Sequence, residues 1–372
     1  MLLLAIISIL ANPFFRVPIK KKDGTYDAEL ETGDSGKALS VIVMVNGNEE
    51  ALERNLPILL SQEYEPGFQV IIVGERLVAD ADELLARFGN DPRLSYTFIP
   101  DTSRYISREK LGITLGVKAA VNEWCVLVDS SSRPNSNHWL QEIGKCCTDD
   151  RNIVMGYCNY DEDAKTRMRF YRLMHFAYLW RECNKGTAFC SNGANIAFRK
   201  SEFIDNDGYR GNLDIIRGEY DFIVNKFARK GTTAVVASYD GSVTEEAPTT
   251  KQWHRQNIFH IHSCKHMQRR KRHRVWQCVD TLFLHLSWLA SVCAAVYAGI
   301  MHDYILLASA ALALIVFILG RTLVSMRAIK AFDADVPAWR ILPLELNSIW
   351  HYLADRLRYL AADSYDFTCH KL

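Results

Sequence analysis

Residues 39–62 read LSVIVMVNGNEEALERNLPILLSQ. The first seven, Leu39 to Val45, form a continuous apolar run, which is typical of a strand buried on both faces of a sheet. After a polar break at 46–49, residues 50–62 place leucines at 52, 56, 59 and 60, the spacing of a helix with one buried face. A strand followed directly by a helix is the repeating unit of a parallel α/β sheet.

The same alternation continues along the chain. Further buried strands are expected at 68–73, 94–99 and 123–129, and helices at 79–88 and 107–120. The predicted fold class is therefore α/β, with a mainly parallel sheet flanked by helices on both faces.

Polar residues follow the ends of these strands. Ligands of such sheets bind outside the carboxyl ends of the strands, where Asn46, Glu49, Glu75 and Asp129 are expected to lie. No GxGxxG follows the first strand and no GxxxxGK[ST] occurs, so a dinucleotide-dependent dehydrogenase or a P-loop NTPase is poorly supported.

Two long apolar runs stand near the C-terminus, at 278–300 and 304–320. Each is about the length needed to cross a hydrocarbon core of about 30 Å, and the break between them allows only a tight turn. A pair of buried core helices is the alternative, but the second run has no polar face. The sequence predicts a transmembrane hairpin over 278–320.

Charge gives the orientation. Six of the ten residues from Lys265 to Arg274 are Lys or Arg, within a juxtamembrane segment at 265–277, and more basic residues follow the hairpin. This pattern places both outer ends in the cytoplasm. Over the whole chain, 44 Lys and Arg nearly balance 43 Asp and Glu, which argues against a nucleic-acid partner.

The two ends of the chain supply further membrane candidates. Residues 1–19 begin with an apolar stretch whose basic residues follow it, so a short N-terminal anchor fits better than a signal peptide. The tail at 321–372 is amphipathic, and either lies in the membrane interface or packs on the soluble domain. The expected location is the inner (cytoplasmic) membrane, multi-pass, with a cytoplasmic domain at 37–264.

The ten cysteines are scattered, without a CxxC. Cys146 and Cys147 are adjacent, which is a poor geometry for a structural zinc site. Free buried thiols in a reducing compartment are the expected state.

Three later segments complete a pattern: SREKLGITLGVKAAVNEWCVLVDSSSRPNSNHWL at 107–140, SNGANIAFRKSEF at 191–203 and RGEYDFIVNKFA at 217–228. Together with residues 39–64, they resemble the membrane-bound bacterial family 2 glycosyltransferases of the GT-A fold, over about 39–270. The resemblance implies an enzyme that transfers a sugar from a nucleotide-sugar donor to a lipid-linked or cell-envelope glycan at the cytoplasmic membrane face. It also implies an inverting displacement and Mg²⁺ or Mn²⁺ as cofactor.

The resemblance also assigns residues to the donor. Asp129 matches the first acid of the family's Asp-x-Asp, which binds the metal, and Ser131 stands where the second acid is usual. A metal can bind through one carboxylate if the donor phosphates and water supply the rest. Glu75 takes the place of the acid that reads the nucleotide base, and Asn195 ends the segment beside the diphosphate. A polar turn that caps the next helix is the alternative for 129–131.

The general base is expected in the later acidic motif, at Asp221 or Glu219, although two acids also suit the first turn of any helix. The Gln-x-x-Arg-Trp of processive members is replaced by residues 256–260, so a nonprocessive enzyme is expected. The histidines and arginine of this region either approach the phosphates or form a solvated basic stretch: His254, Arg255, His260 and His262.

These departures leave a second hypothesis open. A catalytically degraded, glycosyltransferase-like membrane scaffold or accessory protein would also carry Ser131 in place of the acid.

Overall fold

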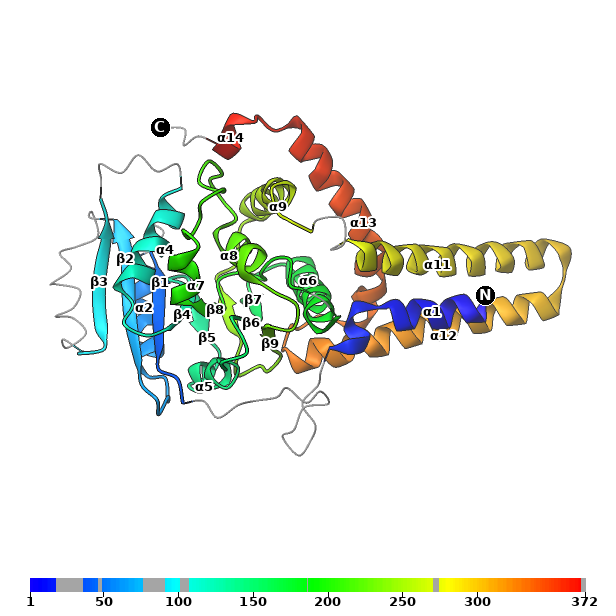
Figure 1. Cartoon of the computed structure of the whole chain (residues 1–372). Coiled ribbons are helices and arrows are strands. Elements are labelled where there is room, and N and C mark those ends of the chain that lie inside the picture. Colours follow the sequence, from blue (N-terminus) through cyan, green and yellow to red (C-terminus); the bar gives the residue numbers. More distant parts are fainter. Residues whose placement is uncertain are drawn as a thin grey trace.

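The computed structural model describes residues 1–17, 36–45, 49–75, 91–100, 107–185, 187–269 and 274–368. A seven-stranded sheet with the order β3-β2-β1-β4-β8-β6-β9 forms the centre of the α/β domain (Figure 1). Its strands are β1 (Leu39–Met44), β2 (Phe68–Glu75), β3 (Leu94–Ile99), β4 (Trp124–Asp129), β6 (Ile153–Gly156), β8 (Ile196–Arg199) and β9 (Thr233–Val236).

Most neighbouring strands are parallel, which confirms the predicted sheet. Leu39 of β1 lies opposite Phe68 of β2 and opposite Trp124 of β4, and both pairings are parallel. β2 with β3 and β6 with β9 are parallel as well. β8 is antiparallel to both of its neighbours, β4 and β6.

Helices cover both faces of the sheet (Figure 1). The side chains of β1 alternate between the two cores: Val41 and Val43 pack with α2 (Glu49–Leu60) and α5 (Trp139–Gly144). Ile42 and Met44 pack with α4 (Arg108–Ala119) and α6 (Thr166–Lys185) on the other face. The helix expected at 79–88 lies outside the described residues.

A small sheet with the order β5-β10-β7 extends from the carboxyl ends of β4 and β6. β5 (Ser132–Pro134) follows β4 after a two-residue turn, and β7 (Cys158–Tyr160) follows β6 after one residue. Between them lies β10 (Val243–Glu245). The helices α7 (Lys200–Asp205), α8 (Glu219–Phe227) and α9 (Thr250–Lys265) complete this end of the domain.

Two antiparallel helices, α11 (Val275–Met301) and α12 (Tyr304–Ala331), project from the domain (Figure 1). Both are long and apolar enough to cross a membrane. α1 (Leu2–Ala11) lies along them and leads into the 3₁₀ turn η1 (Pro13–Arg16). Ten residues of helix span about 15 Å, about half of a bilayer core, so α1 by itself is too short to cross.

The tail predicted at 321–372 forms the end of α12 and then two further helices. α12 continues beyond the expected end at residue 320, because Ala328 and Ile329 pack into the core of the α/β domain. The remainder forms α13 (Ala338–Ala361) and α14 (Tyr365–Thr368). α13 packs against α9, so contact with the domain is the arrangement found for this helix.

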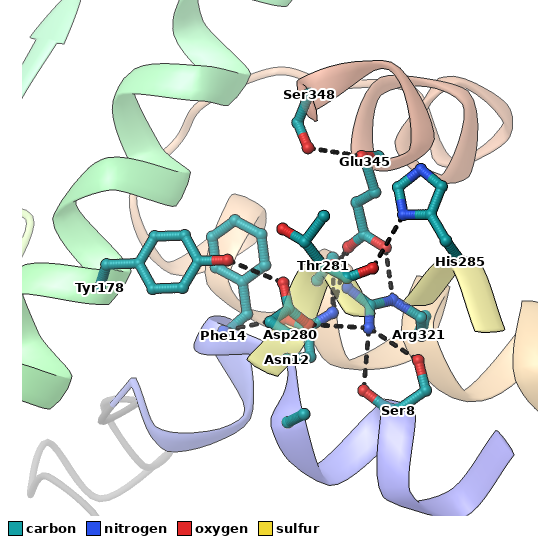
Figure 2. Close-up of polar contacts among 12 residues, drawn as sticks. Ser8, Asn12, Phe14, Tyr178, Asp280, Thr281, His285, Arg321, Glu345 and Ser348 are labelled. Carbon is teal, nitrogen blue, oxygen red and sulfur yellow. Dashed lines mark hydrogen bonds and ion pairs between the residues drawn. The ribbon is translucent and has the colours of Figure 1, made fainter. Parts of the chain in front are cut away.

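A buried ion cluster joins the hairpin to the rest of the molecule (Figure 2). The Arg321 side chain is 1% exposed. Its Nη1 lies 3.0 Å from Oδ1 of Asp280 in α11, and its Nε lies 2.6 Å from Oε2 of Glu345 in α13. One cation therefore compensates two carboxylates that are themselves buried.

Three further groups complete this cluster (Figure 2). Arg321 Nη1 donates to the carbonyl and hydroxyl oxygens of Ser8 in α1, at 2.8 and 3.0 Å. Tyr178 of α6 donates its hydroxyl to Asp280 at 2.7 Å, and Asn12 donates to Glu345 at 3.1 Å. The cluster thus links α1, α6, α11, α12 and α13.

Replacing Arg321 with Met should destabilise the protein by about 3–5 kcal/mol, because Asp280 and Glu345 would remain buried without a cation. The measurement is thermal unfolding of the full chain in detergent, with Lys330→Met, an exposed cation of the same helix, as the control. If Arg321→Met and Lys330→Met unfold at the same temperature, this account is contradicted.

Candidate active site

A cavity of about 850 Å³ opens at the carboxyl edge of the sheet. Its walls come from the end of β4, from α6, from the loop before β8, from α8, from the end of β10, from α9 and from α13. The beginning of α11 also reaches it, through Arg274 and Gln277. The cavity therefore lies between the α/β domain and the base of the hairpin.

Asp129 ends β4 and faces this cavity. Its Oδ1 accepts a hydrogen bond from the hydroxyl of Tyr220, which follows Glu219 in α8. Burial raises the pKa of Asp129 to about 7, and the charges of Glu245 and Glu219 act in the same direction, against the Tyr220 hydrogen bond. Asp129 is thus a carboxyl group in an already acidic site.

Glu219 begins α8 and is 8% exposed. The Arg217 guanidinium contacts Glu109 of α4 and lies 3.9 Å from Glu219 Oε1. Burial, and then the charge of Glu219, raise the pKa of Glu109 well above its usual range. The buried Glu219 Oε2 accepts no hydrogen bond from the described residues as long as Glu109 is ionised. A protonated Glu109 carboxyl group would be the one donor near it among these residues.

Asp221 also faces the cavity, but both of its carboxylate oxygens are engaged. Oδ1 accepts from the backbone N–H and the hydroxyl of Ser191, at 3.0 and 2.9 Å, and Oδ2 lies 2.9 Å from Nδ1 of His260. Burial acts to raise the pKa of Asp221, but His260 and Ser191 outweigh it and hold the pKa below its usual value. Asp221 is an ionised, fixed acceptor.

The structure adds an ion pair that the sequence did not indicate. Arg172 of α6 donates from Nη2 to Glu245 Oε1 at 2.7 Å, and its guanidinium lies 4.5 Å from the centre of the Tyr160 ring. Gly193 makes room for this pair, because a Cβ there would lie 2.3 Å from Arg172 Nη2, and its φ of +134° also favours glycine. These partners are 73 residues apart in the chain.

Asn195 lies away from the cavity. It is fully buried, and its amide accepts from Trp139 Nε1 and donates to the carbonyls of Tyr157 and Gly241. Within this segment, the amide that lines the cavity is that of Asn192, three residues earlier. Asn192 accepts from the backbone N–H of Cys158 at 2.9 Å, so its position is also fixed by the fold.

The other predicted donor contacts divide as follows. Ser131 lines the cavity beside Asp129. Glu49 is exposed at the start of α2, and Glu75 ends β2 opposite Ile99. None of the described residues that line the cavity comes from α2 or β2. Asn46 lies outside the described residues.

Of the basic residues predicted near the phosphates, two line the cavity, Arg255 and His260. His254 instead pairs with Asp355 of α13, with 2.9 Å between Nδ1 and Oδ1. His262 stacks on Phe367 of α14, with ring centres 4.4 Å apart.

The cavity suits a hard divalent cation. Mg²⁺ and Mn²⁺ take oxygen ligands, which the Asp129 carboxylate and the Ser131 hydroxyl provide. The neighbouring charges of Glu219 and Glu245, which raise the pKa of Asp129, are ones that a cation would offset. A cation bound through Asp129 Oδ1 would compete with the Tyr220 hydroxyl for that oxygen.

Comparison with known proteins gives a fold relationship. No protein-family model and no curated protein sequence matches the chain. Among solved structures, the mannosyltransferase PcManGT from Pyrobaculum calidifontis, in complex with GDP-Man and Mn²⁺, matches with a TM-score of 0.53 at 14% identity, over 98% of this chain and 99% of that one. S. aureus TarS 1–349 matches with a TM-score of 0.42 at 14% identity, over 84% of this chain and 92% of that one. The match to the mannosyltransferase over nearly the whole of both chains gives this chain the fold of a glycosyltransferase.

Removing the Tyr220 hydroxyl should free Asp129 for a cation. A hydrogen bond to a charged group contributes about 1.5–3 kcal/mol, so Tyr220→Phe should bind Mn²⁺ at least about ten-fold more tightly. Calorimetric titration with Mn²⁺ in the presence of a nucleoside diphosphate measures this, with the exposed Tyr239→Phe as the control. Unchanged or weaker Mn²⁺ binding by Tyr220→Phe, measured at a pH where Asp129 is ionised, would contradict a competition between the Tyr220 hydroxyl and the cation for Asp129.

Proposed function

We propose that this protein is a nonprocessive glycosyltransferase that transfers a sugar from a nucleotide-sugar donor to a lipid-linked or cell-envelope glycan. One observation carries the proposal: Asp129, Glu219 and Asp221, from β4 and α8, meet at a single cavity on the carboxyl edge of the sheet. The fold around this cavity is shared with a mannosyltransferase whose solved complex contains GDP-Man and Mn²⁺.

The donor diphosphate would lie beside Asp129 and Ser131, which would hold Mg²⁺ or Mn²⁺ between them and the phosphates. The bound metal would neutralise the charge that gathers on the leaving diphosphate. Arg255 also lines the cavity and presents an exposed guanidinium to the same charge. Because Ser131 has no carboxylate, more of the metal coordination falls to the donor phosphates and water.

Of the two candidate bases, we favour Glu219. Among the described residues, only a proton on Glu109 could occupy its buried Oε2, whereas both oxygens of Asp221 already accept hydrogen bonds from Ser191 and His260. Glu219 would take the proton of the acceptor hydroxyl. At the same time, the acceptor oxygen bonds to the sugar carbon and the bond from that carbon to the diphosphate breaks. A single displacement of this kind inverts the configuration at that carbon.

The membrane position of the enzyme is part of the proposal. α11 and α12 expose large apolar side chains along their length, which is unusual for a water-soluble surface: Leu282, Leu286, Leu289, Leu312, Ile315 and Leu319. We infer that the hairpin inserts from the cytoplasmic side of the cell membrane, with α1 packed along it. Arg274 and Gln277, at the start of α11, line the cavity, so a lipid-borne acceptor could reach it from the membrane surface.

Two observations favour the alternative of a catalytically degraded scaffold. Tyr220 occupies a carboxylate oxygen of Asp129, and Ser131 offers a hydroxyl where a second acid would strengthen cation binding. A scaffold of this kind would keep the fold and the membrane hairpin but would bind no donor.

Glu219→Gln should lower the rate of donor turnover by about 10²–10⁴-fold and leave donor affinity nearly unchanged, because it removes the base but not a phosphate contact. Asp129→Asn should instead weaken donor binding in Mn²⁺. A panel of UDP- and GDP-sugars, assayed for binding and hydrolysis with and without Mn²⁺, measures both effects.

The matched control is Glu162→Gln, an exposed acid outside the cavity. If the wild-type protein binds no donor under any condition and Asp129→Asn changes nothing, the scaffold hypothesis replaces the enzyme.

A further inference from the structure

Three metal-ligating side chains meet at the wall of the cavity, on the side of Asp221. His175 comes from α6, Cys190 from the loop before β8 and His260 from α9. One nitrogen of each histidine and the Cys190 sulfur lie within 4.8 Å of one another. Three separate elements supply these atoms, so the cluster does not follow from the periodicity of any single helix.

The spacings of these atoms are near those of a tetrahedral zinc site. Zn–N bonds of about 2.0–2.1 Å and Zn–S bonds of about 2.3 Å place a ligand nitrogen and sulfur about 3.5–3.6 Å apart. Nε2 of His175 lies 3.8 Å from Sγ of Cys190. The two imidazole rings are nearly perpendicular, at 83°, with centres 5.6 Å apart.

Cys264 lies next to this group but outside the set of atoms within 4.8 Å of one another, and would become a fourth ligand by a rotation of its side chain. It lies one helical turn after His260 on α9, and its Sγ is 3.5 Å from His260 Nε2. Cys264 is 3% exposed and lines the cavity. Two cysteines and two histidines form one of the common ligand sets of structural zinc.

The surroundings of His260 fit this role. Its Nδ1 lies 2.9 Å from Asp221 Oδ2, which fixes the ring with Nε2 on the side of the Cys264 sulfur. Histidines that bind zinc usually donate their other N–H to a carboxylate in this way. Ser191 holds Asp221 through two further hydrogen bonds, so the supporting groups are in place without the metal.

The cluster is also accessible and reduced. His175, His260 and Cys264 line the cavity, which gives an ion a path to the fully buried Cys190. Both thiols are free. His175 Nε2 now lies 3.2 Å from the Ser191 carbonyl oxygen, a contact that it would exchange for the metal.

We propose that His175, Cys190, His260 and Cys264 bind one zinc ion beside the donor cavity, with Asp221 as the hydrogen-bond partner of His260. Two Zn–S and two Zn–N bonds form, and the two thiol protons and the proton on Nε2 of His260 pass to solvent. The ion would clamp α6 and α9 to the loop before β8 and so fix one wall of the cavity. The proposal does not depend on donor chemistry, because soft nitrogen and sulfur ligands select zinc over Mg²⁺ or Mn²⁺.

The test uses the full chain, purified in detergent under reducing conditions. We expect about one zinc per chain by elemental analysis, and, after chelation, Co²⁺ should give the visible bands of a tetrahedral site and a thiolate charge-transfer band. Absence of zinc together with absence of these Co²⁺ bands in the wild-type protein would overturn the proposal without the use of any variant.

Variants assign the ligands. Cys190→Ser should abolish stoichiometric zinc, Cys264→Ser should halve the charge-transfer band, and Asp221→Asn should lower zinc affinity about 10–100-fold. Cys293→Ser removes an exposed thiol of α11 and should keep one zinc. Asp129→Asn should also keep one zinc, which distinguishes this site from that of the donor cation. Unchanged zinc content and spectra in both Cys190→Ser and Cys264→Ser would contradict the site.

Discussion

The guanidinium of Arg321 is the point on which the arrangement of the molecule depends. It is buried between Asp280 and Glu345. A movement of the hairpin, α1 or α13 relative to the others would therefore separate buried charges from their partners. A buried ion cluster of this kind adds little net stability compared with a well-packed apolar core, but breaking it is costly. We infer that its role is to fix the geometry, since Tyr178 extends the cluster from Asp280 into α6.

That connection matters because α6 also forms a wall of the cavity. Arg172 and His175 lie on this helix, one or two turns before Tyr178, and both line the cavity. The position of the hairpin and the position of cavity-lining groups are therefore set by the same rigid element. If the hairpin spans a membrane, as we propose, the walls of the cavity are held in a fixed position relative to it.

Much of the fold could be predicted from local pattern. The apolar run at Leu39–Val45 indicated a strand buried on both faces, and β1 is such a strand. The runs at 278–300 and 304–320 indicated two long helices, and α11 and α12 are these helices. Strand-end position also indicated Asp129, which lines the cavity. These features depend on residues close together in the chain, which is what periodicity reports.

The rest depends on contacts between distant segments. Asn195 follows a glycine turn as a phosphate-binding residue would, yet Trp139 and two carbonyl groups use its amide inside the core. The sequence indicated both acids of α8 but not Tyr220 between them, whose direction toward Asp129 follows from the rotation of the helix. Cysteine spacing gave no zinc motif, because the proposed ligands come together only when α6, α9 and the β8 loop pack.

The most direct test of the central claim is a structure of the full chain with a nucleotide-sugar and Mn²⁺. The account predicts that the diphosphate lies in the cavity between Asp129 and Arg255, that the Tyr220 hydroxyl has moved away from Asp129, and that the sugar carbon to be transferred faces Glu219. A donor bound elsewhere, or a complex at saturating donor and Mn²⁺ in which Asp129 contacts neither the cation nor the diphosphate, would contradict it.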